Sequence, residues 1–140
     1  MLALMWVGFL LQKQGLIQNC DGALIPFVPE GLKGIFFSPL LHGSWEHLLS
    51  NSLPIGVLLV LLYQFYPEVS SKVFFRGWLF TGALVWIMPP QFLFDGQYTC
   101  IVGASGIVYM LAFFLFFSGV FRWNVKLLTI SLLVVLYYGS

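Results

Sequence analysis

Residues 96–121, GQYTCIVGASGIVYMLAFFLFFSGVF, contain no Asp, Glu, Lys or Arg. A helix needs about 20 mostly apolar residues to cross a bilayer, because each residue rises about 1.5 Å and the hydrocarbon layer is about 30 Å thick. This stretch is long enough to form such a helix. It therefore predicts that the chain enters a membrane.

Two more stretches without charge lie at residues 47–67 and 77–94. Shorter apolar stretches at residues 2–17 and 127–138 suggest a first and a last span. We therefore predict an all-α fold, a polytopic bundle of transmembrane helices. The last stretch lacks the polar flank that usually closes a span at the headgroups. Residues 1–140 are thus expected to form a single membrane domain that is truncated at its C-terminus.

The composition agrees with a membrane environment. The chain is 60% hydrophobic and 8% charged, whereas soluble domains carry roughly a quarter of their residues as charges. The formal net charge is +1, so bulk electrostatics gives no support to nucleic-acid binding. The partner that the composition itself predicts is the lipid bilayer.

Four basic residues predict the orientation of the spans. Lys72 and Arg76 lie between the second and third predicted spans, and Arg122 and Lys126 lie between the fourth and fifth. Short loops that carry Lys and Arg face the cytoplasm. The N-terminus is therefore predicted to be cytoplasmic, and the loop around Asp95, which has no basic residue, is predicted to face outside.

Cys20 and Cys100 both fall in loops or span ends that are predicted to face outside. A disulfide is chemically permitted on that side of a membrane. The sequence leaves two alternatives open, a bond between these cysteines and two separate thiols.

His47 and Asn51 are polar residues at the start of the second predicted span. Because they are four residues apart, both project from one face of a helix. Pro54 follows and removes the backbone donor that would bond the Ser50 carbonyl, so the helix is expected to be loosened there. Two interpretations stay open. The pair forms hydrogen bonds between helices, or it belongs to a functional site, as costly polar groups in membranes often do.

His42 lies five residues before His47, and we expect it to cap or orient its neighbours at the interface, beside Trp45. A metal site is not predicted. Zinc needs three or four ligands in a tetrahedral arrangement, and neither a third histidine nor an acidic residue lies on the same helix face.

The segment Gly103-Ala104-Ser105-Gly106 opens the fourth predicted span. Flanking glycines let another backbone approach the serine hydroxyl, and a helix N-terminus offers free N–H groups to a developing oxyanion. Small residues also serve close packing of membrane helices, so the segment alone leaves both readings open. The predicted topology brings Ser105 to the same depth as His47 and Asn51, near the outer face, which favours acyl transfer.

Together these residues resemble the rhomboid family of intramembrane serine proteases. HGSWEHLLSN at residues 42–51 reproduces the family's histidine, histidine, asparagine pattern, and GASGIVY at residues 103–109 resembles its GxSG nucleophile motif. The resemblance runs from about Gly31 to Tyr138. It implies a six-span rhomboid-like bundle, of which about five spans lie within these residues and the domain is truncated before the sixth.

The resemblance also implies roles for single residues. Ser105 matches the nucleophile, whereas His47 and Asn51 match the side chains that stabilise the oxyanion with the Ser105 backbone. Tyr109 matches the tyrosine whose ring packs beneath the catalytic histidine. The other supporting positions are His42, Gly103 and Gly106. The first external loop, with Phe36 and Phe37, is similar to the family's loop that lies partly in the outer leaflet.

One feature departs from the family pattern. Rhomboids take their general base from a histidine in the sixth span, and this sequence has no histidine after His47. The 140 residues alone are therefore expected to lack activity, unless His47 itself is the base. No metal or organic cofactor is implied.

The function that we predict is that of an intramembrane serine endopeptidase, which hydrolyses peptide bonds in or near the transmembrane segments of membrane proteins. The expected location is a bacterial inner membrane, with the active site toward the outer face. The alternative is a catalytically inactive rhomboid-like protein that binds membrane clients. A transporter is disfavoured, since the polar cluster does not continue through the midplane and no internal symmetry is evident.

Overall fold

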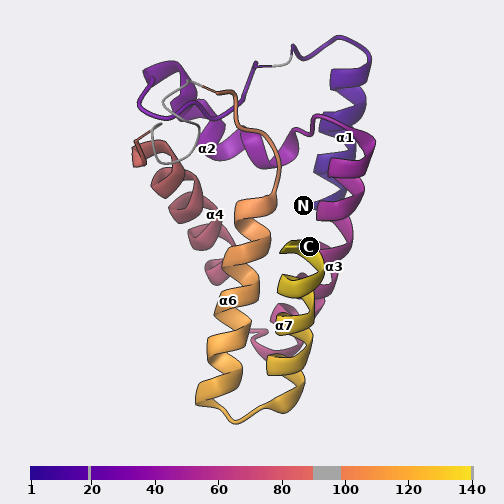
Figure 1. Cartoon of the computed structure of the whole chain (residues 1–140), viewed down its shortest axis with the longest axis vertical. Coiled ribbons are helices and arrows are strands. Elements are labelled where there is room, and N and C mark those ends of the chain that lie inside the picture. The colour runs from indigo at the N-terminus through magenta and orange to yellow at the C-terminus, as the bar shows by residue number, and fades with distance from the viewer. Residues whose placement is uncertain (19, 90–98, 140) are drawn as a thin grey trace.

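The computed structural model describes residues 1–18, 20–89 and 99–139 (Figure 1). Within these ranges the chain is helical apart from its loops and one isolated β-bridge. This confirms the predicted all-α fold. In chain order the elements are α1 (Leu2–Lys13), η1 (Pro29–Lys33), α2 (Gly34–Phe37), η2 (Ser38–Leu40), α3 (Trp45–Phe65), α4 (Ser70–Ile87), α6 (Ser105–Phe121) and α7 (Val125–Gly139).

Helix α6 lies at the centre of the bundle and packs against α3, α4 and α7 (Figure 1). Its buried face repeats at the spacing of one helical turn, with Ile107, Leu111 and Leu115 each almost fully buried. Residues four apart lie on one side of a helix. The apolar core therefore follows this side of α6, and it includes Leu58 and Leu62 of α3.

Two described helices are long and apolar enough to cross a membrane, Trp45–Phe65 and Ser105–Arg122. At about 1.5 Å per residue, the 21 residues of α3 extend for about 31 Å. The apolar helices α1 and α7 are shorter. Helix α3 continues without interruption through Pro54, so the predicted loosening does not end the helix.

The predicted third span begins earlier than expected. Helix α4 starts at Ser70, and Lys72 and Arg76 lie in its first two turns instead of in a loop. Lys and Arg are good helix formers, and their long side chains reach from a helix end toward the headgroups, so charge alone does not mark the helix boundary. The predicted end of this span at residue 94 and the loop around Asp95 lie outside the described residues.

The fourth span begins where the Gly103–Gly106 segment predicted it, later than the start of the charge-free stretch at residue 96. Residues 99–104 are not helical, and Ile101 forms an antiparallel bridge with Leu24 through N–H···O distances of 2.8 and 2.9 Å. Gly103 has φ +113°, a conformation that only glycine adopts easily and that an α-helix cannot contain. Helix α6 therefore starts at Ser105, directly after this turn.

The segment between α1 and α3 is joined to the rest of the chain by specific bonds. A disulfide connects Cys20 with Cys100, which resolves the alternative left open by the sequence. The indole N–H groups of Trp78 and Trp86 on α4 each donate to a loop carbonyl, of Ile35 and Val28, at 3.0 Å. The short helix α2 is thereby held against α4.

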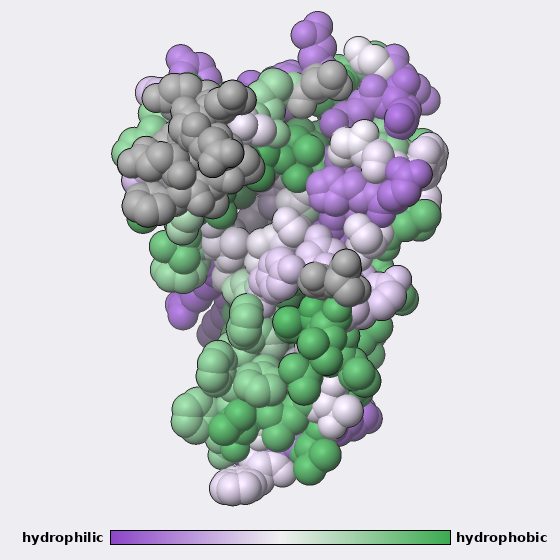
Figure 2. All heavy atoms as spheres, viewed as in Figure 1, coloured by the Kyte–Doolittle hydropathy of each residue, from purple (hydrophilic) through white to green (hydrophobic). Residues whose placement is uncertain are grey.

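The surface separates by polarity along the long axis. Figure 2 shows apolar side chains over the lower part of α6 and α7, and hydrophilic side chains gathered near the end of α1 at the upper right. Phe113 and Phe117 on α6 are about half exposed, as are Phe36 and Phe37 of α2. Large apolar side chains that remain exposed over a wide area mark a surface built for contact with lipid or with other apolar groups.

Candidate active site

The first turns of α3 and α6 meet at the end of the bundle that carries the loop. The α3 helix begins with Ser44 as its N-cap, whose hydroxyl accepts from the His47 backbone N–H at 3.1 Å. This cap satisfies one of the free N–H groups of the first turn. It determines where α3 begins, and hence where His47 and Asn51 project.

His47 lies directly against the turn that precedes Ser105. A Cβ atom added at Gly103 would come within 2.5 Å of Cε1 and 2.6 Å of Nε2 of the His47 ring. The backbone N–H of Gly103 donates to the Ser38 carbonyl at 2.8 Å, which holds the turn in place. The close approach of ring and backbone requires glycine here, and it brings two predicted site residues together.

Asn51 is completely buried. Its Nδ2 donates to the backbone carbonyl of His47 at 2.8 Å, and its Oδ1 accepts from the Tyr138 hydroxyl at 2.8 Å. The amide is therefore held at both ends. One hydrogen on Nδ2 remains for another acceptor, since an amide nitrogen carries two.

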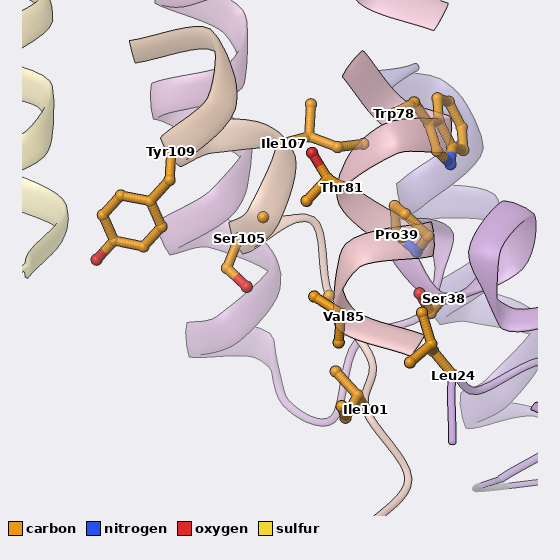
Figure 3. A pocket seen from close by; sticks show the side chains of 13 residues that line it. Leu24, Ser38, Pro39, Trp78, Thr81, Val85, Ile101, Ser105, Ile107 and Tyr109 are labelled. Atoms are coloured by element: carbon orange, nitrogen blue, oxygen red, sulfur yellow. The ribbon is translucent and has the colours of Figure 1, made fainter. Parts of the chain in front are cut away.

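Ser105 is the first residue of α6, so the free N–H groups of a helix N-terminus surround it. It lines a cavity of about 190 Å³ together with Gly103, Gly106, Thr81 and Ile101. Figure 3 shows this cavity, with Ser105 and Tyr109 on successive turns of α6 and Tyr109 pointing away from Thr81 and Val85.

The predicted supporting positions on α6 have two different surroundings. The Tyr109 ring packs edge-on against the ring of Tyr138, with 5.3 Å between centroids. Gly106 faces α4, where an added Cβ would lie 2.6 Å from Cγ2 of Thr81. Gly106 thus allows α6 and α4 to approach closely, while Tyr109 forms part of the wall beside Ser105.

His42, which was predicted to cap or orient its neighbours, is buried within the protein. Only 1% of the residue is exposed, and neither ring nitrogen has a hydrogen-bond partner among the described residues. Its ring is edge-on to His47 with 5.1 Å between centroids, and its backbone N–H donates to Gln12 Oε1 at 3.0 Å. Burial, together with the nearby charge of protonated His47, lowers the pKa of His42 to about 4. His42 is therefore neutral at pH 7.

Tyr138 was not identified from the sequence. It lies near the end of α7, and an aromatic residue at a span end usually indicates only the membrane interface. No local pattern distinguishes a tyrosine that bonds to Asn51 from one that anchors a helix. The contact arises because α7 packs between α3 and α6.

Within the described ranges, no three His, Cys, Asp or Glu side chains gather closely enough to hold a metal ion. The groups that do gather are a serine hydroxyl, an amide, an imidazole and the free N–H groups of a helix end. Such a set offers a nucleophile next to hydrogen-bond donors in apolar surroundings. This is the requirement for stabilising a tetrahedral oxyanion.

Comparison with known proteins agrees with this geometry. The family model described as the Rhomboid domain matches residues 29–139. Uncharacterized proteins of Mycobacterium bovis and Mycobacterium tuberculosis are each 33% identical over 120 residues, which cover 82% of this chain and 48% of the relative. An uncharacterized protein of Mycobacterium leprae is 32% identical over 112 residues, 78% of this chain and 43% of its own.

The chain spans about half the length of the curated relatives it matches. No solved structure matches it significantly. The match to the family model covers most of the chain and includes both polar segments, residues 42–51 and 103–109. The chain is an integral membrane protein that belongs to the rhomboid family.

Proposed function

We propose that the whole protein is an intramembrane serine endopeptidase, which cuts peptide bonds in or near the transmembrane segments of membrane proteins. The observation that carries the proposal is the convergence of three helices on Ser105. His47 of α3 lies against the Gly103 turn that precedes Ser105 of α6, and Asn51, one turn after His47, accepts from the Tyr138 hydroxyl of α7 at 2.8 Å. Mycobacterial relatives support a bacterial inner membrane, and the basic residues support a site that opens to the outer face.

The proposed reaction begins when Ser105 Oγ attacks the carbonyl carbon of the substrate and its proton passes to a base. The resulting oxyanion would accept from the Ser105 backbone N–H, from the second hydrogen on Asn51 Nδ2 and from His47. Cleavage of the C–N bond returns the proton to the leaving amine. Water then hydrolyses the acyl-enzyme, and the same base takes and returns its proton.

The base is the part of the proposal that these residues do not supply by themselves. The sequence holds two histidines, His42 and His47. His42 is buried without a path of bonds to Ser105, and His47 is proposed to serve the oxyanion. The resemblance to the family implies a histidine base other than these two, from a sixth span.

The proposal can be tested on the product of the complete gene, purified in detergent. A fluorophosphonate or isocoumarin probe is expected to label the wild-type protein and not Ser105→Ala. The matched control is Ser131→Ala, because Ser131 is a buried serine whose hydroxyl, among the described residues, bonds to carbonyls of its own helix. Equal labelling of the wild type and Ser105→Ala would refute the assignment of Ser105 as nucleophile.

A second assay addresses the oxyanion groups. His47→Ala and Asn51→Ala are each expected to lower the labelling rate by about 10²–10³-fold, the usual effect of losing one oxyanion donor. The inactive client-binding alternative gains support if the wild type shows no labelling and no cleavage of a single-span substrate, but still co-purifies with that substrate.

A further inference from the structure

The Asn51 side chain is bonded to two different helices of the bundle. Its Nδ2 donates to the His47 carbonyl of α3 at 2.8 Å, and its Oδ1 accepts from the Tyr138 hydroxyl of α7 at 2.8 Å. Helix α7 packs beside α3, which brings together two residues that are 87 positions apart in the chain (Figure 1). Among the described residues, Tyr138 is the partner from outside α3 that holds this amide.

These two bonds fix the orientation of the amide. A side-chain amide is planar, its oxygen only accepts, and its nitrogen carries two hydrogens. Once Oδ1 and one N–H each have a partner, the plane of the group and the direction of the second N–H are determined. That second N–H is the proposed donor to the oxyanion. The Tyr138 hydroxyl therefore influences this donor although its own bond is to Oδ1.

The bond within α3 is a weak hold on the amide by itself. In an α-helix the His47 carbonyl also accepts the backbone N–H four residues later, so the Asn51 side chain shares this acceptor. Asn51 is completely buried, and without Tyr138 its Oδ1 would be a buried acceptor that lacks its partner, which favours rotation of the amide. The Tyr138 ring is itself placed by its edge-on contact with Tyr109.

We infer that Tyr138 is a positioning residue of the site, which directs the second N–H of Asn51 toward the oxyanion by holding Oδ1. The inference rests on the proposed function of the same site. An oxyanion donor acts in the transition state, so its misplacement lowers kcat and leaves KM almost unchanged. Because Tyr138 acts through Asn51, its loss should have no further effect once the Asn51 amide is absent.

The test is a double-mutant cycle of Tyr138→Phe and Asn51→Ala in the product of the complete gene, with a single-span substrate. Tyr138→Phe loses the hydroxyl and keeps the ring against Tyr109. Its kcat, per site titrated with the fluorophosphonate probe, is expected to fall roughly five- to tenfold, the factor of one hydrogen bond of ordinary strength, with KM within about twofold. In the Asn51→Ala background the same change should alter kcat by less than about twofold.

Two further proteins serve as controls. Tyr63→Phe should have the kcat and KM of the wild type, because the Tyr63 hydroxyl bonds to Ser71 at the other end of α3. Replacement of Tyr138 by 4-aminophenylalanine puts an N–H donor where the hydroxyl stood, and it should recover most of the kcat that Tyr138→Phe loses.

Each outcome decides the inference. An equal fall in kcat in both backgrounds overturns it, because Tyr138 would then act independently of Asn51. An unchanged kcat in Tyr138→Phe overturns it too, even if the melting temperature falls, since a merely structural bond between helices gives that result. If Tyr138→Phe yields no folded protein, the double variant, which lacks the unpartnered amide, has to fold, and its failure also overturns the inference. Labelling that persists in Ser105→Ala would instead refute the proposed function, so the two failures are distinguishable.

Discussion

The two ends of the bundle are held together in different ways. We call the end with the first turns of α3 and α6 the site end, and the turn at residues 122–124 between α6 and α7 the hairpin end. The site end depends on a disulfide, a glycine contact and directed hydrogen bonds. The hairpin end depends mainly on packing, with Gly119 of α6 in close contact with Leu128 of α7.

Polar contacts also exist at the hairpin end, but they stabilise the turn between α6 and α7. Tyr66 and Ser118 share a hydrogen bond between their hydroxyls, and the Arg122 guanidinium lies 4.7 Å from the centre of the Tyr66 ring. Asn124 caps α7 by accepting from the Leu127 N–H at 3.2 Å. These contacts close a turn. Those of the site end position reactive groups, so substitutions at the two ends should affect different measurements.

The largest effect is expected from the disulfide of the site end. Cys20 and Cys100 are 80 residues apart, and a closed loop of this length stabilises a protein by about 4.5 kcal/mol in the chain-entropy relation. Because helices in a membrane already restrict the unfolded chain, we expect the Cys20→Ser, Cys100→Ser double variant to lose about 2–4 kcal/mol. Thermal unfolding in detergent, with and without reductant, measures this.

Reductant should lower the melting temperature of the wild type and leave that of the double variant unchanged. An equal response of both proteins would show that the bond does not contribute. Because the bond precedes Gly103 by three residues, Ser105 labelling should fall in the reduced wild type as well. If stability fell without any loss of labelling, the disulfide would not help to position Ser105. The contrast that we describe between the two ends would then be wrong.

The second effect concerns pH and His42. Its pKa is near 4 in the folded protein and near 6.5 when unfolded, so the unfolded state binds more protons between these values. The contribution of His42 to stability is therefore constant above pH 6.5 and falls as the pH drops toward 4, by at most roughly 3 kcal/mol. Unfolding measured at pH 4.5 to 7.5 for the wild type and His42→Phe checks this. The difference between their slopes isolates His42, and identical slopes would contradict its burial.

The third effect belongs to the interior toward the hairpin end. Leu115 is fully buried in α6, and Leu115→Ala should cost about 2 kcal/mol, the low end for such truncations, because lipid reduces the transfer term. Labelling of Ser105 per folded molecule should not change. Phe121→Ala is the control, since Phe121 is 82% exposed and its loss should leave stability unaltered. A large loss of labelling in Leu115→Ala would contradict the expectation that substitutions toward the hairpin end change stability and not the reactivity of Ser105.

The smallest effect is expected from the cap of α3. Ser44→Ala removes the acceptor of the His47 N–H and should cost about 1 kcal/mol. Since the same bond determines where α3 begins, Ser105 labelling should slow even where the protein remains folded. Ser44→Asp restores the cap and should recover both stability and labelling. Recovery of stability alone would show that the cap has no role in placing His47.

Much of this architecture could be predicted from local patterns. The spacing of His47 and Asn51 and the glycines around Ser105 indicated which residues share a face or a helix end. Hydropathy indicated which stretches form helices. The helix boundaries were less accurate where only charge indicated them, as α4 begins at Ser70 and the charge-free stretch from residue 96 becomes helical only at Ser105. Those boundaries depend on caps and on the Gly103 turn, which hydropathy does not measure.

The sequence by itself determined the helices, the membrane environment and the polar residues that gather near one face, because these follow from composition and from spacing within one segment. Only the tertiary structure decided that Cys20 pairs with Cys100, that His42 is buried and that Tyr138 bonds to Asn51. Each of these joins residues far apart in the chain. Such contacts depend on how each helix is rotated against its neighbours, and no single segment encodes that rotation.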